Sequence, residues 1–347
     1  MGKTERITCE YLKSDDIFAD VLNIALYSGE NVVKPENISK LDTTYMTEVP
    51  DVFAGKSGNK KEKSQTQVRK YRDILRMVRL SGECDNAEYC VRLIAGVEQQ
   101  TNVHYAMPVR DMLYDALEYA EQVRENARDN LSLRADVTGK QRFTHAEFLS
   151  GMKKGDKLIP VVTIVVYFQP EEWDGPKSLH EMLDFTGMSD EMVNIIPDYK
   201  MLVLQPSDYE ETFTGKLKST LSVVLGLLKR AGSKTEFKNY VDMHSEIFRE
   251  LSYDAAAVVN EYCSIGIPKE EIRGKEAVNM CKAIEEIREE GRIEGENQGR
   301  TEGEQIGERR GKIMAYMDMG VSMEEIAGKL KVTLGEVKQI AAEIVTS

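Results

Sequence analysis

Residues 73–80, DILRMVRL, and residues 88–98, EYCVRLIAGVE, decide the fold that this sequence predicts. Both runs are rich in apolar and β-branched residues, and the segment between them, SGECDNA, contains the turn formers Gly, Asp and Asn. We therefore predict an antiparallel β-hairpin. If its centre lies between Asp85 and Asn86, antiparallel pairing sets Asp73 directly opposite Glu98.

Two helices are expected on either side of this hairpin in the sequence. Residues 15–27, DDIFADVLNIALY, predict an amphipathic helix that begins after a cap at Ser14 or Asp15. Residues 107–128 predict the principal core helix. Six of its residues are expected to share the buried face: Met107, Val109, Leu113, Ala116, Leu117 and Ala120.

Two further strands complete the predicted sheet. Residues 158–168, LIPVVTIVVYF, are typical of a buried central strand because they are rich in β-branched residues. Residues 200–206, KMLVLQP, predict a last strand. The predicted fold class is therefore α/β (α+β), a mixed sheet flanked by helices and followed by an all-helical C-terminal region.

The chain is expected to divide into four parts. We predict a core at 1–213, a helical extension at 214–286, a Glu/Arg-rich stretch at 287–311 and a small trihelical module at 312–347. In the third part glycine recurs at every fourth position, from Gly291 to Gly311. Each glycine costs a lone helix about 0.8–1.0 kcal/mol relative to alanine. Two interpretations follow: a homo-oligomer formed through this glycine-repeat helix, or a flexible acidic tether.

The last 36 residues resemble a helix-turn-helix arrangement. Ser322 with Glu325 and Thr333 with Glu336 form capping-box signatures, so the last helix should begin near Leu334. The start of that helix offers few side chains that could read bases. An assembly module is therefore at least as well supported as a DNA reader.

Composition indicates a folded protein without a membrane span. The hydrophobic fraction is 41% and the charged fraction 30%, which are ordinary globular values. The longest apolar run, near 158–168, is far shorter than the roughly 20 residues that cross a bilayer. The polar amino terminus lacks the apolar stretch of a secretory signal. Five cysteines without CxxC spacing argue against disulfides and structural zinc, so we expect a cytoplasmic protein.

The charge distribution bears on nucleic acid as a partner. A formal net charge of −13 argues against phosphate binding, but residues 51–80 contain nine basic and three acidic residues. The segment from Lys56 to Lys70 could guide a phosphate backbone or form a solvated connector, and both interpretations remain open. Candidate DNA contacts are Lys70, Arg72, Arg76 and Arg110.

Asp73 and Glu98 form the constellation that could carry chemistry. Directly opposed residues have Cβ atoms about 4.5–5.5 Å apart, close enough for two carboxylates to share one cation. Gln100 follows two residues after Glu98 and is expected on the same face of the strand. The alternative is that both acids are solvated strand ends.

The surrounding motifs resemble a known family. An Asp that opens one strand, an ExQ at the end of the next, and HYAMPVRDMLYDALEY after it resemble the PD-(D/E)xK nuclease family transposases, also described as recombination-promoting nucleases. The stretches at 18–38, 147–168 and 173–183 are similar to the same family, as is the Gly/Glu-rich tail. The resemblance covers roughly residues 10–205.

This resemblance implies a restriction-endonuclease-like core that cleaves DNA with Mg²⁺, or with Mn²⁺ in its place. It implies Asp73 and Glu98 as metal ligands, with Asp20 as the acid that completes the site. Gln100 takes the position at which many relatives carry Lys. Because Gln is neutral, it could only orient water or phosphate through hydrogen bonds.

Competing hypotheses come from the same residues. The neutral Gln100 and the acidic balance favour a catalytically inactive nuclease-fold protein that serves as an oligomeric interaction or DNA-binding module. Arg110 and Tyr114 are spaced i, i+4 on the predicted helix, so local pairing is the simpler interpretation. His104 is a weak candidate for a base or a metal ligand.

Overall fold

The computed structural model describes residues 2–41, 47–48, 67–68, 73–81, 90–132, 144–268, 272 and 276–345. The chain forms two compact units, Met1–Cys281 and Lys282–Ser347. The first unit contains the sheet and the helices that pack around it. The second unit consists, over its described residues, of helices joined by short turns.

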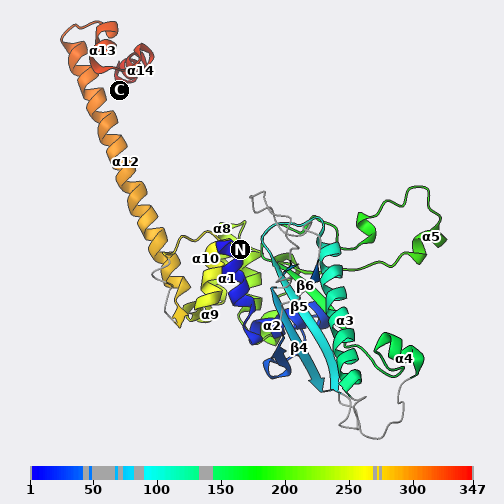
Figure 1. Cartoon of the computed structure of the whole chain (residues 1–347). Helices are drawn as coiled ribbons and strands as arrows, with labels where there is room; N and C mark the ends of the chain where they lie inside the picture. Colours follow the sequence, from blue (N-terminus) through cyan, green and yellow to red (C-terminus); the bar gives the residue numbers. More distant parts are fainter. Residues whose placement is uncertain are drawn as a thin grey trace. The chain divides into compact units, whose positions relative to one another are not determined.

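A five-stranded mixed sheet organises the first unit (Figure 1). Its strands lie in the order β1 (Ile38–Lys40), β4 (Ile74–Ser81), β5 (Cys90–Gln100), β6 (Val161–Tyr167) and β7 (Leu202–Leu204). The pairs β1–β4 and β4–β5 are antiparallel, whereas β5–β6 and β6–β7 are parallel. The prediction of a mixed α/β fold is confirmed. A separate short pair joins β2 (Thr47–Glu48) to β3 (Gln67–Val68).

The predicted hairpin has the predicted register. Ile74 pairs with Val97 and Ser81 pairs with Cys90, which is the pairing that follows from a centre between residues 85 and 86. The turn itself lies outside the described residues. The expected strands at 158–168 and 200–206 are confirmed as β6 and β7. The last five residues of β6 are all buried, because the strand lies between two parallel neighbours.

Helices cover both faces of the sheet. Helices α1 (Lys3–Leu12) and α2 (Asp15–Tyr27) lie on one face, and α3 (Met107–Ser132) lies on the other (Figure 1). The bounds of α2 and its cap at Ser14 agree with the prediction. Helix α1 was not predicted, because its sequence KTERITCEYL has few apolar residues and its burial comes from packing against the later helix α10 (Tyr253–Tyr262).

The buried face of α3 differs from the predicted one. Of the six residues expected to be buried there, Met107 is buried, whereas Ala116 and Ala120 are exposed. The buried residues include several polar ones: Asp111, Asp115, Glu118 and Gln122. Asp115 accepts hydrogen bonds of 2.7 Å from the Thr163 hydroxyl and of 2.7 Å from the Tyr199 hydroxyl. The prediction was wrong because partners of this kind from distant segments stabilise a polar face that periodicity alone would leave in solvent.

The predicted helical extension packs with the sheet in the first unit. It comprises α6 (Phe213–Lys216), α7 (Leu221–Leu228), α8 (Lys234–Met243), α9 (Ser245–Arg249) and α10. All eight residues of α7 are buried, since the helix packs against α8, α10 and α2. A two-stranded pair, β8 (Leu251–Ser252) with β9 (Ala277–Val278), was not predicted.

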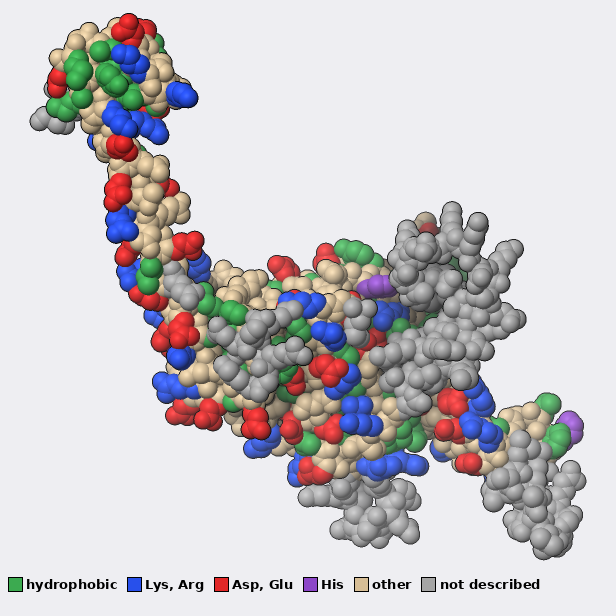
Figure 2. Space-filling view, turned by 60° about the vertical axis from the view of Figure 1, so that its left-hand side comes forward, with side chains coloured by type: hydrophobic (Ala, Val, Ile, Leu, Met, Phe, Trp, Pro, Cys, Tyr) green, Lys and Arg blue, Asp and Glu red, His purple; other side chains and the backbone are tan. Residues whose placement is uncertain are grey.

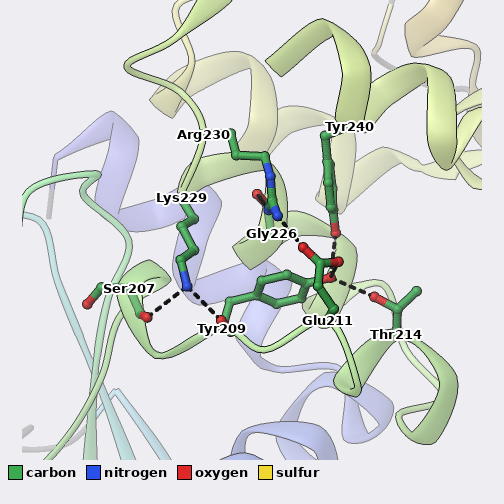
Figure 3. A network of polar contacts seen from close by, with 8 residues as sticks. All are labelled: Ser207, Tyr209, Glu211, Thr214, Gly226, Lys229, Arg230 and Tyr240. Carbon is green, nitrogen blue, oxygen red and sulfur yellow. Dashed lines mark hydrogen bonds and ion pairs between the residues drawn. The ribbon is translucent and has the colours of Figure 1, made fainter. Parts of the chain in front are cut away.

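A polar network fixes this extension (Figure 3). The Tyr240 hydroxyl donates to the Tyr209 hydroxyl over 3.0 Å, and the Arg230 guanidinium lies 4.4 Å from the centre of the Tyr240 ring. Arg230 also forms an ion pair with Glu211. Lys229 donates to the carbonyl oxygens of Ser207 and Tyr209 over 3.2 and 2.8 Å. The segment before α6 is thereby tied to α7 and α8.

His244 makes the stability of this region sensitive to pH. Its ring lies 4.4 Å from that of Tyr240, and burial lowers the pKa of the imidazole. The unfolded chain therefore binds the proton more readily, so stability is lost as the pH falls through about 6.5, by at most about 1.4 kcal/mol per pH unit. We expect the free energy of unfolding in urea to differ less between pH 7.0 and pH 5.5 for His244→Phe than for the wild type. His145→Phe, at an exposed position, is the control and should retain the wild-type difference between the two pH values. The expectation would be contradicted if His244→Phe and His145→Phe showed the same difference.

The second unit begins within the helix α12 (Met280–Asp318) and continues with α13 (Met323–Leu330) and α14 (Leu334–Val345). Its core contains Ile313, Ile326, Ala327 and Val337. Ser322 and Thr333 cap α13 and α14 as predicted, by accepting from the backbone nitrogens of Glu325 and Glu336. The glycine repeat is helical and exposed; self-association through it stays a prediction. Nowhere in the described residues is a helix both long and apolar enough to cross a membrane.

Candidate functional site

The open end of the β4–β5 hairpin brings Asp73 and Glu98 together. Asp73 precedes the first residue of β4, and the register places it beside Glu98 near the end of β5. One hydrogen bond joins them directly, from the Asp73 backbone nitrogen to Glu98 Oε1 over 3.2 Å, and the backbone nitrogen of the next residue, Gln99, donates to Asp73 Oδ2 over 3.1 Å. The two carboxylates are therefore held in a defined arrangement by the ends of their own strands.

Arg110 supplies the positive charge nearest to Glu98 in the described part of the chain. Its Nη2 lies 3.1 Å from Glu98 Oε2, and the Glu98 side chain is completely buried. Arg110 Nε donates to the Tyr114 hydroxyl over 2.7 Å, so the predicted local pairing of these two residues is confirmed. Burial opposes the charge of Arg110, but Glu98, Tyr114 and Asp73 together more than compensate and raise the pKa of the guanidinium.

Two neighbours of this ion pair have altered acidity. Burial raises the pKa of Tyr114 to about 12, so its hydroxyl stays protonated. Burial, together with the charge of Arg110, lowers the pKa of His104. The His104 imidazole is therefore neutral at pH 7, and its Nδ1 has no hydrogen-bond partner among the described residues. A role for His104 as a base stays a prediction.

Gln100 ends β5 at the edge of an open pocket. It pairs in register with Tyr167, the last residue of β6. The pocket has a volume of about 490 Å³ and is lined by Thr101, Asn102, Val103, Tyr105, Tyr167, Gln169, Glu171, Glu172 and Asp174. Asp73 and Glu98 do not line it. Gln100 is partly exposed and directly precedes Thr101, the first residue of the pocket lining.

The remaining predicted site residues lie elsewhere. Asp20 is buried on α2, and its Oδ2 accepts from the Ser219 backbone nitrogen over 2.8 Å, so it connects α2 to the helical extension. The expectation that Asp20 completes a cluster with Asp73 and Glu98 is not met. Among the described residues, no three His, Cys, Asp or Glu side chains are gathered so that they could hold one metal ion.

The expected DNA contact at Arg76 is wrong. Arg76 is 6% exposed, lies over the Phe18 ring and donates to the carbonyl oxygens of Leu75 and Lys13. Its guanidinium therefore serves to pack α1 and α2 against β4, and a phosphate backbone could not reach it. Lys70 and Arg72 lie outside the described residues, and Arg110 is committed to Glu98 and Tyr114.

Comparison with known proteins was uninformative. No protein-family model, curated protein or solved structure matches the chain significantly.

Sequence reasoning missed the acidic face of α3. Asp111, Asp115 and Glu118 are spaced i, i+4 and i+7 and are all buried, with Asp111 completely so. This helical spacing was the signal that could have revealed them, since three acids on one face of a core helix are unusual. Together with Glu98 they make the region where α3 meets the sheet strongly acidic.

Proposed function

We propose that the protein is a metal-dependent DNA endonuclease whose active site includes Asp73, Glu98 and Gln100. The observation that carries this proposal is the interlocked pair of Asp73 and Glu98 at one end of the β4–β5 hairpin. A link to DNA recombination or to a mobile element is proposed from the family resemblance alone. The five cysteines lack CxxC spacing, which supports the further proposal that the protein works in a reducing compartment such as the cytoplasm.

The residues present fit a divalent cation of the magnesium type. Mg²⁺ commonly binds through one or two carboxylates and keeps several waters, so the absence of a third acidic ligand among the described residues does not disqualify the pair. Asp73 is partly exposed and can meet a hydrated ion, whereas Glu98 offers oxygens from a buried position. When bound, such an ion would supply an activated water and neutralise charge that develops on the phosphate.

The chain's own residues would then have separate tasks. Arg110 orients Glu98 and balances its charge through the 3.1 Å contact. The Asp73 and Gln99 backbone nitrogens hold the two carboxylates in register. Gln100 can donate from its amide nitrogen and accept at its oxygen, which suits the orientation of a water or a phosphate oxygen. Tyr114, protonated at all physiological pH values, fixes Arg110.

Plasmid cleavage tests the proposal directly. We expect the purified full-length protein to nick or linearise supercoiled DNA with Mg²⁺ or Mn²⁺, and EDTA to stop the reaction. Titration calorimetry of Mn²⁺ without DNA is a second measurement, and it should detect binding that is lost in Asp73→Asn. A well-folded protein that neither binds Mn²⁺ nor cleaves DNA would contradict the proposal.

One observation favours the second candidate, a catalytically inactive nuclease-fold protein that acts as an interaction module. Glu98 is already neutralised by Arg110, so a metal ion must compete with or share this ion pair. In the inactive protein the pair would be structural. The two candidates differ in the metal dependence of DNA cleavage, which the experiment above measures.

A further inference from the structure

A projecting segment between β6 and β7 leaves apolar side chains in solvent. We call residues 178–200 the arm; it contains the short helices η4 (His180–Met182) and α5 (Asp190–Ile195). Its two ends are joined by the bridge between Ser178 and Lys200 and by the hydrogen bond from the Leu179 nitrogen to the Tyr199 oxygen, 2.9 Å. The Tyr199 hydroxyl also donates to Asp115 of α3, so the arm begins and ends at that helix.

The arm has internal order without a core. A ring nitrogen of His180 lies 2.8 Å from the Ile196 oxygen, and the His180 ring meets the Phe185 ring edge-on at 5.0 Å. Yet no residue from 181 to 200 is buried. Five large apolar side chains are exposed there, with Ile195 at 79% and the others at 36–55%: Met182, Leu183, Met188, Met192 and Ile195. A dense group of exposed apolar residues on an ordered segment indicates a surface that another protein surface covers.

The charge of the arm restricts what can cover it. The arm contains five acids, a single lysine, Lys200, at its end, and no arginine. Hydrogen bonds from neighbouring groups lower the pKa of Asp184, Glu191 and Asp198, so these carboxylates stay ionised. The complementary surface must therefore combine apolar side chains with positive charge.

Residues 144–157, which we call the lobe, provide such a surface in the same chain. The lobe contains α4 (His145–Ser150), on which Phe148 is 58% and Leu149 80% exposed. Figure 2 shows hydrophobic side chains at the outer end of this lobe, at the lower right of the view.

The charge that the lobe presents is positive. Residues 144–157 contain three lysines and two acids, Glu147 and Asp156, and both acids accept hydrogen bonds from Thr144, Asn130 or neighbouring backbone nitrogens. Lys154 and Lys157 are exposed in the same lobe. The lobe therefore offers the combination that the arm requires.

The two surfaces lie on the same side of the sheet but are attached to different parts of α3 (Figure 1). The arm is bound at Asp115 through Tyr199, and the lobe is bound at Asn130, which donates to the Gly151 oxygen over 2.9 Å. At 1.5 Å per residue these attachment points are on the order of 22 Å apart along the helix. A twofold axis that runs beside α3, perpendicular to the helix and level with the midpoint between the two attachment points, would set the arm of one copy against the lobe of the other, twice.

We propose that two copies of this chain associate reciprocally, with the acidic apolar arm of each copy packed on the basic apolar lobe of its partner. This contact is separate from the glycine-repeat helix and independent of the proposed nuclease activity. It buries Met192 and Ile195 against Phe148 and Leu149, and it pairs the carboxylates of the arm with Lys154 and Lys157.

The experiment measures the mass of the full-length protein by sedimentation equilibrium at low ionic strength. Met192→Asp/Ile195→Asp should raise the dissociation constant about tenfold or more, because it places charge in the apolar part of the contact. Met243→Asp, at a residue that is 73% exposed on α8, is the matched control and should leave the constant unchanged.

Charge reversal identifies the partner surface. Asp190→Lys/Glu191→Lys on the arm and Lys154→Glu/Lys157→Glu on the lobe should each weaken association, and the chain that carries all four changes should recover it. That recovery also shows that the variants fold. The proposal would be overturned by a monomeric wild type or by an assembly whose mass is unchanged in the arm and lobe variants. It would also be overturned if the chain with all four changes failed to associate.

Discussion

Replacing Glu98 with Gln is expected to abolish metal-dependent DNA cleavage and to lower the free energy of unfolding. The loss of a ligand that contributes several kcal/mol to transition-state stabilisation corresponds to about 10³-fold or more in rate. Glu98 is completely buried, and its substitution leaves the mostly buried Arg110 without its counter-charge. Breaking such a pair costs about 3–5 kcal/mol when both groups are buried, so we expect about 2–3 kcal/mol here.

Three proteins separate the catalytic part of this effect from the structural part. The double variant Glu98→Gln/Arg110→Gln should recover much of the stability but none of the cleavage. Glu121→Gln removes a partly exposed carboxylate that pairs with Arg124 and Arg128 on α3, and it should change stability by less than about 1 kcal/mol and leave cleavage intact. Full cleavage by Glu98→Gln would refute a role for this carboxylate in catalysis.

Gly226→Ala is expected to destabilise the first unit by about 2 kcal/mol. A methyl group at residue 226 would lie within 3.0 Å of the Tyr240 hydroxyl and of the Tyr209 ring. Neither ring can move easily, because their hydroxyls are bonded to each other and the Arg230 guanidinium lies over both rings. Overpacking of this kind costs about 1–3 kcal/mol, and the higher helix propensity of alanine returns about 1 kcal/mol at most.

Thermal and urea unfolding of paired variants can test this expectation. Gly215→Ala on α6 meets no atom within 4 Å and should be neutral or slightly stabilising. Adding Tyr240→Phe to Gly226→Ala removes the nearest obstructing atom, so the double variant should lose less stability than the two single changes together. Equal behaviour of Gly226→Ala and Gly215→Ala would contradict the close approach described for α7.

The features that could be predicted from the sequence are those fixed by local pattern. The hairpin register followed from the turn formers around Asp85, and it correctly brought Asp73 beside Glu98. Helix α2 and the start of α14 at Leu334 followed from periodicity and capping residues. In each case neighbouring residues alone decide the structure.

The predictions that were wrong concern features that depend on partners far away in the chain. Arg76 looked like a surface cation, but it lies over the Phe18 ring and donates to the Lys13 carbonyl oxygen, some sixty residues earlier. Asp20 looked like a metal ligand, but it accepts a hydrogen bond from Ser219, almost 200 residues later. The polar face of α3 likewise exists because Thr163 and Tyr199 bond to Asp115. No local pattern encodes these pairings.

Eight residue pairs join β4 to β5, and this fixed register makes the proposed site sensitive to insertions within the strands. Side chains alternate between the two faces of a strand, so one extra residue between Cys90 and Glu98 would turn the Glu98 side chain to the opposite face. An extra pair of residues in the turn would leave the ladder, and therefore the carboxylates, where they are. Related chains that keep this chemistry should accordingly vary in the length of the turn while conserving the number of residues in each strand.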